Sequence, residues 1–237
     1  MLNILDWGIG WVFFALPILV VIYKRFSGLV AIILKNSRLI DKGLRVFIHR
    51  IIIVIFNICL VLLLGIDLKQ LFLSDNLVKG LIWLIPGFIL GAIVWYLTYQ
   101  VIKNGLGGKE YVKVFLSSPR YYFLNLFLLV GPAEDIFFLG IFTYVLINRL
   151  GWWGIPIYVL FFSFYHYGNV LKGAESNREF LMMLPSRLLI GIILSVAFYR
   201  TNSLIIPILI HNLYDTGNFV AAMMGHRAKN KVQQARI

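Results

Sequence analysis

The sequence predicts an all-α protein, a polytopic bundle of transmembrane helices, and three observations lead to this fold class. Hydrophobic residues make up 60% of the 237 residues and charged residues only 14%, whereas soluble domains carry about 25% charged residues. Apolar stretches of about 20 residues, the length that a spanning helix needs, recur along the chain. No polar stretch is long enough to build a soluble domain, so residues 1–237 are expected to form a single membrane domain.

Seven spans are expected, with one interfacial helix between the first two. The fourth span is overlong and contains Gly131-Pro132 near its centre, so we expect it to be kinked or broken there. Residues 26–47 hold a short apolar patch followed by basic residues, which favours an amphipathic helix lying in the interface. The spans are predicted at about residues 4–23, 48–66, 80–101, 121–147, 154–171, 181–199 and 203–224.

The net charge of +12 indicates membrane topology rather than nucleic-acid binding. Basic residues are spread over short segments between the spans, at 24–45, 103–120 and 172–178, and over the tail after residue 226. This distribution is typical of topology signals and of contacts with anionic lipids. The positive-inside rule therefore predicts an N-terminus outside and a C-terminus in the cytoplasm.

Two adjacent acids, Glu134 and Asp135, lie in the apolar run from 121 to 147. An ionised acid at bilayer depth costs roughly 2.5–3.5 kcal/mol on insertion scales, so a chain that keeps two of them has a partner or a use for them. Neighbouring helical residues project about 100° apart. We expect Glu134 to face a cavity as a base and Asp135 to make a structural contact. The alternative is that both acids are structural and pair with Arg187 and a histidine.

Two histidines in later apolar segments are the expected partners of these acids. His166 follows Phe162 by four residues, so both lie on one helix face; its imidazole would face Glu134 and help to orient or deprotonate a water. The alternative is a core histidine bonded to a backbone carbonyl. His211 lies four residues before Asp215 and could stabilise an oxyanion as a donor. Asp215 would orient His211, while the alternative is a mutually satisfied polar pair.

Arg187 is the basic residue that we place inside a span, where it either snorkels to the interface or provides the counter-charge for Asp135. Asn212, next to His211, is counted among the supporting residues. Glu134, His166 and His211 include ligand types that suit zinc, but they are scattered over three helices, and we expect no metal and no cofactor. The single cysteine, Cys59, excludes an intrachain disulfide.

These motifs resemble the CPBP family, the CAAX protease and bacteriocin-processing group of glutamic intramembrane endopeptidases, which includes the type II CaaX prenyl proteases. The resemblance covers about residues 119–220, the expected catalytic core. It rests on the acid pair, on Phe-x-x-x-His at Phe162 and His166, and on His-x-x-x-Asn/Asp at His211 and Asp215.

The resemblance implies a metal-independent endopeptidase in which Glu134, assisted by His166, activates water, while His211 and Asp215 form the oxyanion side. Its partners would be a membrane-embedded or lipidated peptide substrate, such as a prenylated C-terminus, and the lipid bilayer. The cell membrane of a prokaryote is the expected location. One departure is that the family motif Glu-Glu-x-x-x-Arg is Glu-Asp-x-x-x-Leu here, with Leu139 in place of the arginine, so a degenerate member is the other possibility.

Two other functions remain open at this point. One is a non-catalytic CPBP-fold scaffold or bacteriocin-immunity membrane protein, which would keep the buried polar cluster without needing Glu134 as a base. The other is a proton-coupled transporter, in which the acids and histidines form a relay. The chain is short and shows no internal repeat, which argues against the transporter.

Overall fold

The computed structural model describes residues 9–234, apart from 37–40, 74–75, 107–108, 172 and 174, and every regular element among these residues is helical. The long helices are α1 (Ile9–Asn36), α2 (Lys42–Leu63), α5 (Leu84–Lys103), α10 (Gly154–Tyr165), α12 (Asn177–Thr201) and α13 (Ile205–Gln234). Shorter pieces join them: α3 (Leu68–Phe72), α4 (Leu77–Gly80), η2 (Leu81–Trp83), α6 (Lys109–Ser117), α7 (Pro119–Leu124), η3 (Asn125–Leu129), α8 (Val130–Phe137), η4 (Phe138–Thr143), α9 (Tyr144–Leu150), η5 (Gly151–Trp153) and α11 (Gly168–Leu171). The all-helical fold class is therefore confirmed.

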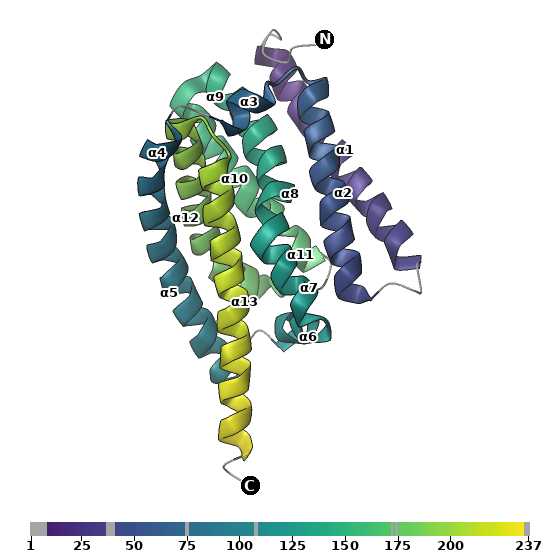
Figure 1. Cartoon of the computed structure of the whole chain (residues 1–237), viewed down its shortest axis with the longest axis vertical. Helices are drawn as coiled ribbons and strands as arrows, with labels where there is room; N and C mark the ends of the chain where they lie inside the picture. Colours follow the sequence, from purple (N-terminus) through teal and green to yellow (C-terminus); the bar gives the residue numbers. More distant parts are fainter. Residues whose placement is uncertain are drawn as a thin grey trace.

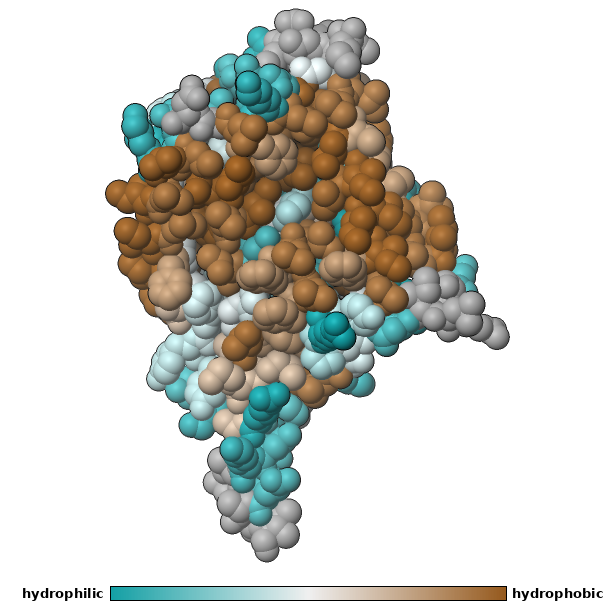
Figure 2. Space-filling model, viewed as in Figure 1, coloured by the Kyte–Doolittle hydropathy of each residue, from teal (hydrophilic) through white to brown (hydrophobic). Residues whose placement is uncertain are grey.

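Five stretches are long and apolar enough to cross a membrane, which confirms an integral membrane protein. Figure 2 shows the matching surface, with a broad brown belt across the molecule and teal, hydrophilic residues toward both ends. The predicted count of seven spans is not confirmed by this criterion, and residues 4–8 of the predicted first span lie outside the described residues. The five stretches are Phe14–Asn36, Lys42–Leu63, Leu68–Lys103, Pro119–Leu171 and Asn177–Thr201.

The interfacial helix predicted within residues 26–47 is wrong. Residues 26–36 continue α1 without interruption, and residues 42–47 form the first turns of α2. The apolar patch at 29–34 follows the apolar first span with no helix-breaking residue other than Gly28 between them, so the same helix continues. Asp41 then starts α2 as its N-cap, because its carboxylate accepts hydrogen bonds from the backbone N–H groups of Gly43 and Leu44.

The fourth predicted span is irregular where the sequence indicated, but it is not broken. Residues 119–150 remain continuously helical, with a π turn at η3 just before α8 and a second π turn at η4 just after it. A proline inside a helix removes one N–H donor and clashes with the carbonyl four residues earlier, here that of Leu128. The wider π turn that ends at Leu129 accommodates Pro132 without ending the helix.

Helix α8 lies in the middle of the bundle, between α2 on one side and α13 on the other (Figure 1). Every residue from Ala133 to Leu146 is buried, whereas α1, α2 and α5 expose large apolar side chains on one face. Helix α13 packs along α5, and α10 packs against α12. The two acids are therefore carried by the most enclosed helical segment of the bundle.

Candidate active site

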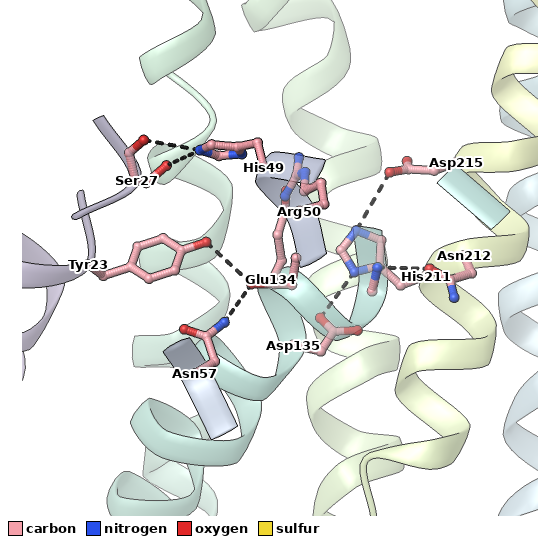
Figure 3. A network of polar contacts seen from close by, with 12 residues as sticks. Tyr23, Ser27, His49, Arg50, Asn57, Glu134, Asp135, His211, Asn212 and Asp215 are labelled. Atoms are coloured by element: carbon pink, nitrogen blue, oxygen red, sulfur yellow. Dashed lines mark hydrogen bonds and ion pairs between the residues drawn. The ribbon is translucent and has the colours of Figure 1, made fainter. Parts of the chain in front are cut away.

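The two adjacent acids of α8 point toward different helices (Figure 3). Glu134 Oε1 accepts a hydrogen bond from Arg50 Nη1 of α2 at 2.8 Å. Asp135 Oδ1 lies 3.0 Å from His211 Nδ1 of α13. The split follows from the rotation of about 100° between neighbouring helical residues, which aims one acid at each flanking helix. Each acid therefore has its own cationic or donor partner.

Helices α1 and α2 also bind the backbone of α8 immediately before Glu134. The Asn57 amide donates to the Ala133 carbonyl at 2.8 Å, and the Tyr23 hydroxyl donates to the same oxygen at 3.3 Å. The Tyr23 ring stacks on Phe137 with ring centroids 4.3 Å apart. These contacts fix the position of α8 beside α2, and with it the position of the Glu134 side chain.

His211 lies between two carboxylates, and the hydrogen bond that orients it comes from Asp135. Its other ring nitrogen, Nε2, is 3.8 Å from Asp215 Oδ2, which is too long for a hydrogen bond. The prediction that Asp215 orients His211 is therefore wrong as stated, because the acid four residues along the same helix is farther away than the acid on α8. Asp215 is also the more exposed of the two, with 29% of its side chain accessible against none for Asp135.

Asn212 joins α13 to the start of α8. Its side-chain oxygen accepts a hydrogen bond from the backbone N–H of Gly131 at 2.7 Å, at the junction between the π turn η3 and α8. A Cβ at Gly131 would lie 2.8 Å from Asn212 Oδ1 and 3.0 Å from the Ile208 carbonyl oxygen. Glycine is thus required for this approach of α8 to α13, which brings His211 within reach of Asp135.

His166 and His211 lie on two edges of one aromatic ring. The Phe162 ring packs edge-on against His166 at 4.9 Å and against His211 at 5.9 Å between ring centroids. Both imidazoles are close enough to Glu134 to interact electrostatically with its carboxylate. His166 is half-buried at the C-cap of α10, and its imidazole ring forms no hydrogen bond with a described residue, so the alternative of a core histidine bonded to a backbone carbonyl is not observed.

Arg187 does not belong to this cluster. Its Nη2 donates to both carboxylate oxygens of Glu175 at 2.9 Å, and its guanidinium lies over the Phe180 ring at 5.1 Å. The predicted pairing with Asp135 is wrong, and so is the alternative that Arg187 pairs with Glu134. Arg187 instead joins α12 to the segment just before it, because the carboxylate of Glu175 lies only twelve residues earlier in the chain.

Sequence reasoning missed Arg50, Asn57 and Tyr23. Arg50 left a signal, because it is a cation near the start of an otherwise apolar segment, 51–56. A second signal was Leu139, which stands where the family motif has arginine and is fully buried in the apolar core. Because no cation stands at that position, the acid pair was expected to find its counter-charge elsewhere in the chain. Asn57 and Tyr23 left no signal, since their contacts become visible only once α1 and α2 lie against α8.

The arrangement brings together an acid with an unused oxygen and two imidazoles. Glu134 Oε2 makes no hydrogen bond with any described residue, whereas Oε1 is held by Arg50. Such a carboxylate can accept a proton from a small molecule placed between it and a histidine. Within the described part of the chain, no three His, Cys, Asp or Glu side chains are grouped so that one metal ion could bind them. A cavity connecting the cluster to the cytoplasm stays a prediction.

Comparison with known families gives this cluster a context. Residues 116–217 match the family model described as type II CAAX prenyl endopeptidase Rce1-like, and this stretch contains both acids of α8, both histidines and Asp215. Neither the curated proteins nor the solved structures include a match to the chain. The family implies a protease that acts on a membrane-associated peptide substrate. Through residues 116–217, the chain is therefore similar to the type II CAAX prenyl endopeptidase Rce1-like family, within the CPBP group.

Proposed function

We propose that this chain is a metal-independent, glutamic-type intramembrane endopeptidase. The observation that carries the proposal is that the two acids of α8 have different partners: Glu134 keeps one carboxylate oxygen free of hydrogen bonds within electrostatic range of two imidazoles, whereas Asp135 binds His211. The substrate would be a membrane-presented peptide, with a prenylated CAAX-type C-terminus as its most specific form.

In the proposed reaction, Glu134 acts as the general base. Its free oxygen takes a proton from a water molecule, and the water oxygen forms a bond to the carbonyl carbon of the scissile peptide. His166 orients that water from the end of α10. The proton taken up by Glu134 then passes to the amide nitrogen as the C–N bond breaks, which restores the carboxylate and releases a carboxylic acid and an amine.

His211 would stabilise the negative charge that develops on the carbonyl oxygen. Its Nδ1–H donates to Asp135, so Nε2 carries a proton only when the ring is an imidazolium. Asp135 and Asp215 supply the negative charges that such a cation needs on both sides. Donors fixed toward a developing oxyanion contribute roughly 2.7–4 kcal/mol to transition-state stabilisation.

Arg50 would act as a positioning residue for Glu134. A single charge-assisted hydrogen bond to Oε1 fixes the rotamer of the carboxylate and balances its charge inside the membrane. The other oxygen then points in one direction instead of several. This arrangement also replaces the missing motif arginine, because a cation from α2 reaches Glu134 where the family pattern has a cation on the same helix as the acids.

A cleavage assay with two matched variants tests the proposal. Glu134→Gln keeps the shape of the side chain but removes the base, while Glu175→Gln makes the same change at the pair with Arg187. In proteoliposomes with a farnesylated CAAX-type peptide, we expect Glu134→Gln to lower kcat about 10²–10⁴-fold and Glu175→Gln to leave kcat close to wild type. Thermal unfolding of each variant in detergent separates lost chemistry from lost folding.

A non-catalytic scaffold is the second candidate, and two observations favour it. Arg50 already engages the carboxylate that the reaction needs, and Leu139 departs from the family motif. A wild-type chain that binds the farnesylated peptide without cleaving it, and whose binding is unchanged by Glu134→Gln, would establish the scaffold instead of the protease.

A further inference from the structure

A groove on the outside of the bundle lies between the start of α7 and the C-terminal half of α13. It has a volume of about 510 Å³, and its apolar part is formed by exposed side chains that include Phe123, Val220 and Met224. Two arginines, Arg120 and Arg227, also line it. The groove is separate from the acid–histidine cluster, and none of its lining residues takes part in the proposed reaction.

The groove crosses the boundary between the apolar and the polar parts of the molecule. Pro119 is the first residue of the membrane-crossing stretch 119–171, so Arg120 lies at the edge of that stretch. On α13, the apolar sequence ends at Met224 and is followed by Gly225, His226 and Arg227. Both elements lie toward the end of the bundle where α13 finishes (Figure 1). The arginines therefore lie at the polar edge of the apolar sequence on both elements, where lipid headgroups are expected.

Among the residues that the structure describes, the two arginines have no counter-charge. Neither guanidinium forms an ion pair or hydrogen bond with any residue that the structure describes, and both side chains are exposed. The sequence contains no acidic residue after Asp215, so the tail of α13 offers Arg227 no carboxylate. Guanidinium groups bind phosphate oxygens in a planar, two-point geometry. An anionic group bound between them would satisfy both charges.

We propose that this groove binds one anionic phospholipid, with its phosphate at Arg120 and Arg227 and an acyl chain along Phe123, Val220 and Met224. Charge complementarity selects the headgroup, since a zwitterionic lipid carries an ammonium that would face two unpaired cations. Burial of the acyl chain removes the apolar lining from contact with water and mobile headgroups. The bound lipid joins α7, which continues through η3 into α8, to α13, which carries His211 and Asp215.

Lipid retention tests this inference without depending on catalytic activity. The protein is reconstituted in nanodiscs with equal amounts of phosphatidylglycerol and phosphatidylcholine, extracted in mild detergent, washed, and analysed for bound lipid by mass spectrometry. We expect retained phosphatidylglycerol to exceed phosphatidylcholine. In Arg120→Gln/Arg227→Gln it should fall at least about tenfold, because each basic side chain contributes attraction to an anionic headgroup.

Two matched controls separate this site from general charge and from misfolding. Arg25→Gln/Arg178→Gln removes the same charge from two exposed arginines outside the groove and should keep the lipid. Val220→Trp fills the apolar part with both arginines intact and should lose it, whereas Leu209→Trp, at an exposed position outside the groove, should not. Equal retention of the two lipids, equal loss in both arginine double variants, or displacement of the lipid by a farnesylated peptide in an Arg120-dependent way would overturn the proposal.

Discussion

Among the described residues, two arginine–glutamate pairs stabilise this bundle, and they use their carboxylates differently. In the pair of Arg187 and Glu175, both carboxylate oxygens accept from one guanidinium nitrogen, and the partners are twelve residues apart. In the pair of Arg50 and Glu134, one oxygen accepts, and the partners are 84 residues apart. The first pair is local and its acid is fully engaged. The second joins distant helices and leaves an oxygen unused at the centre of the fold.

The difference shows that a rare cation in an apolar segment does not by itself locate chemistry. Arg187 and Arg50 both interrupt apolar sequence, yet only Arg50 reaches an acid in the enclosed segment 133–146. In the outer pair the unused group is a donor, Arg187 Nη1, which is buried without a hydrogen-bond partner, whereas the inner cluster leaves carboxylate oxygens unused. Besides the free oxygen of Glu134, Asp135 Oδ2 is buried without a hydrogen-bond partner, and His211 Nε2 stands 3.8 Å from Asp215. Unused donors and acceptors of this kind require an explanation, and a substrate or water provides one.

The largest expected effect comes from returning arginine to the motif position. Leu139→Arg places a cation in the apolar core, where the effective desolvation penalty is several kcal/mol per ion, and Asp135 is already paired with His211. We expect this variant to fail to fold or to unfold at a much lower temperature in detergent. Leu139→Met, which is similar in volume and uncharged, is the control. It should lower the free energy of unfolding by less than about 1.5 kcal/mol. A Leu139→Arg protein as stable as wild type would mean that Arg50 has not replaced the motif cation.

The next largest effect is expected at the buried pair of Asp135 and His211. Asp135→Asn removes the negative partner of a fully buried contact, and breaking such pairs costs about 3–5 kcal/mol of unfolding free energy. Asp215→Asn is the matched control on the other side of the imidazole, with a longer separation and a more exposed carboxylate. We expect it to cost under about 1 kcal/mol. Urea unfolding in micelles measures the unfolding free energy of both variants. An equal loss in the two would show that Asp135 and Asp215 stabilise His211 to the same extent.

A smaller loss of unfolding free energy is expected when either arginine is replaced, and the two replacements can be compared directly. Arg50→Gln and Arg187→Gln each remove one charge-assisted interaction, and each should cost about 1.5–3 kcal/mol of unfolding free energy. Only Arg50→Gln should also lower kcat on the farnesylated peptide, because only Arg50 fixes Glu134. Arg50→Lys, which keeps the charge but not the planar geometry, should recover part of the activity. Equal kcat in the two glutamine variants would contradict the positioning role of Arg50.

The sequence predicted the parts of this arrangement that depend on local geometry. Composition and apolar run length were sufficient for an all-helical membrane protein, and the rotation of about 100° per residue predicted that Glu134 and Asp135 point apart. The i,i+4 spacing of Phe162 and His166 placed both on one face of α10, where the aromatic ring contacts both histidines. These inferences need only one helix at a time.

The parts that failed depend on how helices meet. The partner of each acid was unpredictable because Arg50, Arg187 and His211 are all chemically suitable, and only the packing of α8 between α2 and α13 selects among them. The spacing of His211 and Asp215 suggested a pair, but α8 brings Asp135 closer than one helical turn brings Asp215. The supposed interfacial helix failed for a related reason, since an apolar patch does not reveal whether the preceding helix continues through it.

The smallest expected effect lies outside the membrane, where Asp41 closes the start of α2 against α7. The Ser118 hydroxyl donates to its carboxylate at 2.6 Å and the Gly43 N–H donates at 2.8 Å, and these bonds to the charged form lower the pKa of Asp41. A lowered pKa in the folded state gives stability that is present above the ordinary value of about 3.9. That stability is lost as the pH falls through the folded-state value.

Asp41→Asn keeps a capping oxygen but removes the titrating charge. The unfolding temperature of the wild type should therefore exceed that of the variant at neutral pH, and the gap should narrow as the pH falls into the acid range. Asp67→Asn is the matched control, because Asp67 caps α3 through a hydrogen bond from the Lys69 N–H but lacks the hydroxyl donor on a second helix. A difference in unfolding temperature that stays constant with pH would show that the Ser118 contact stabilises the cap by geometry alone. The charge of Asp41, unlike the charges around α8, would then contribute nothing to stability.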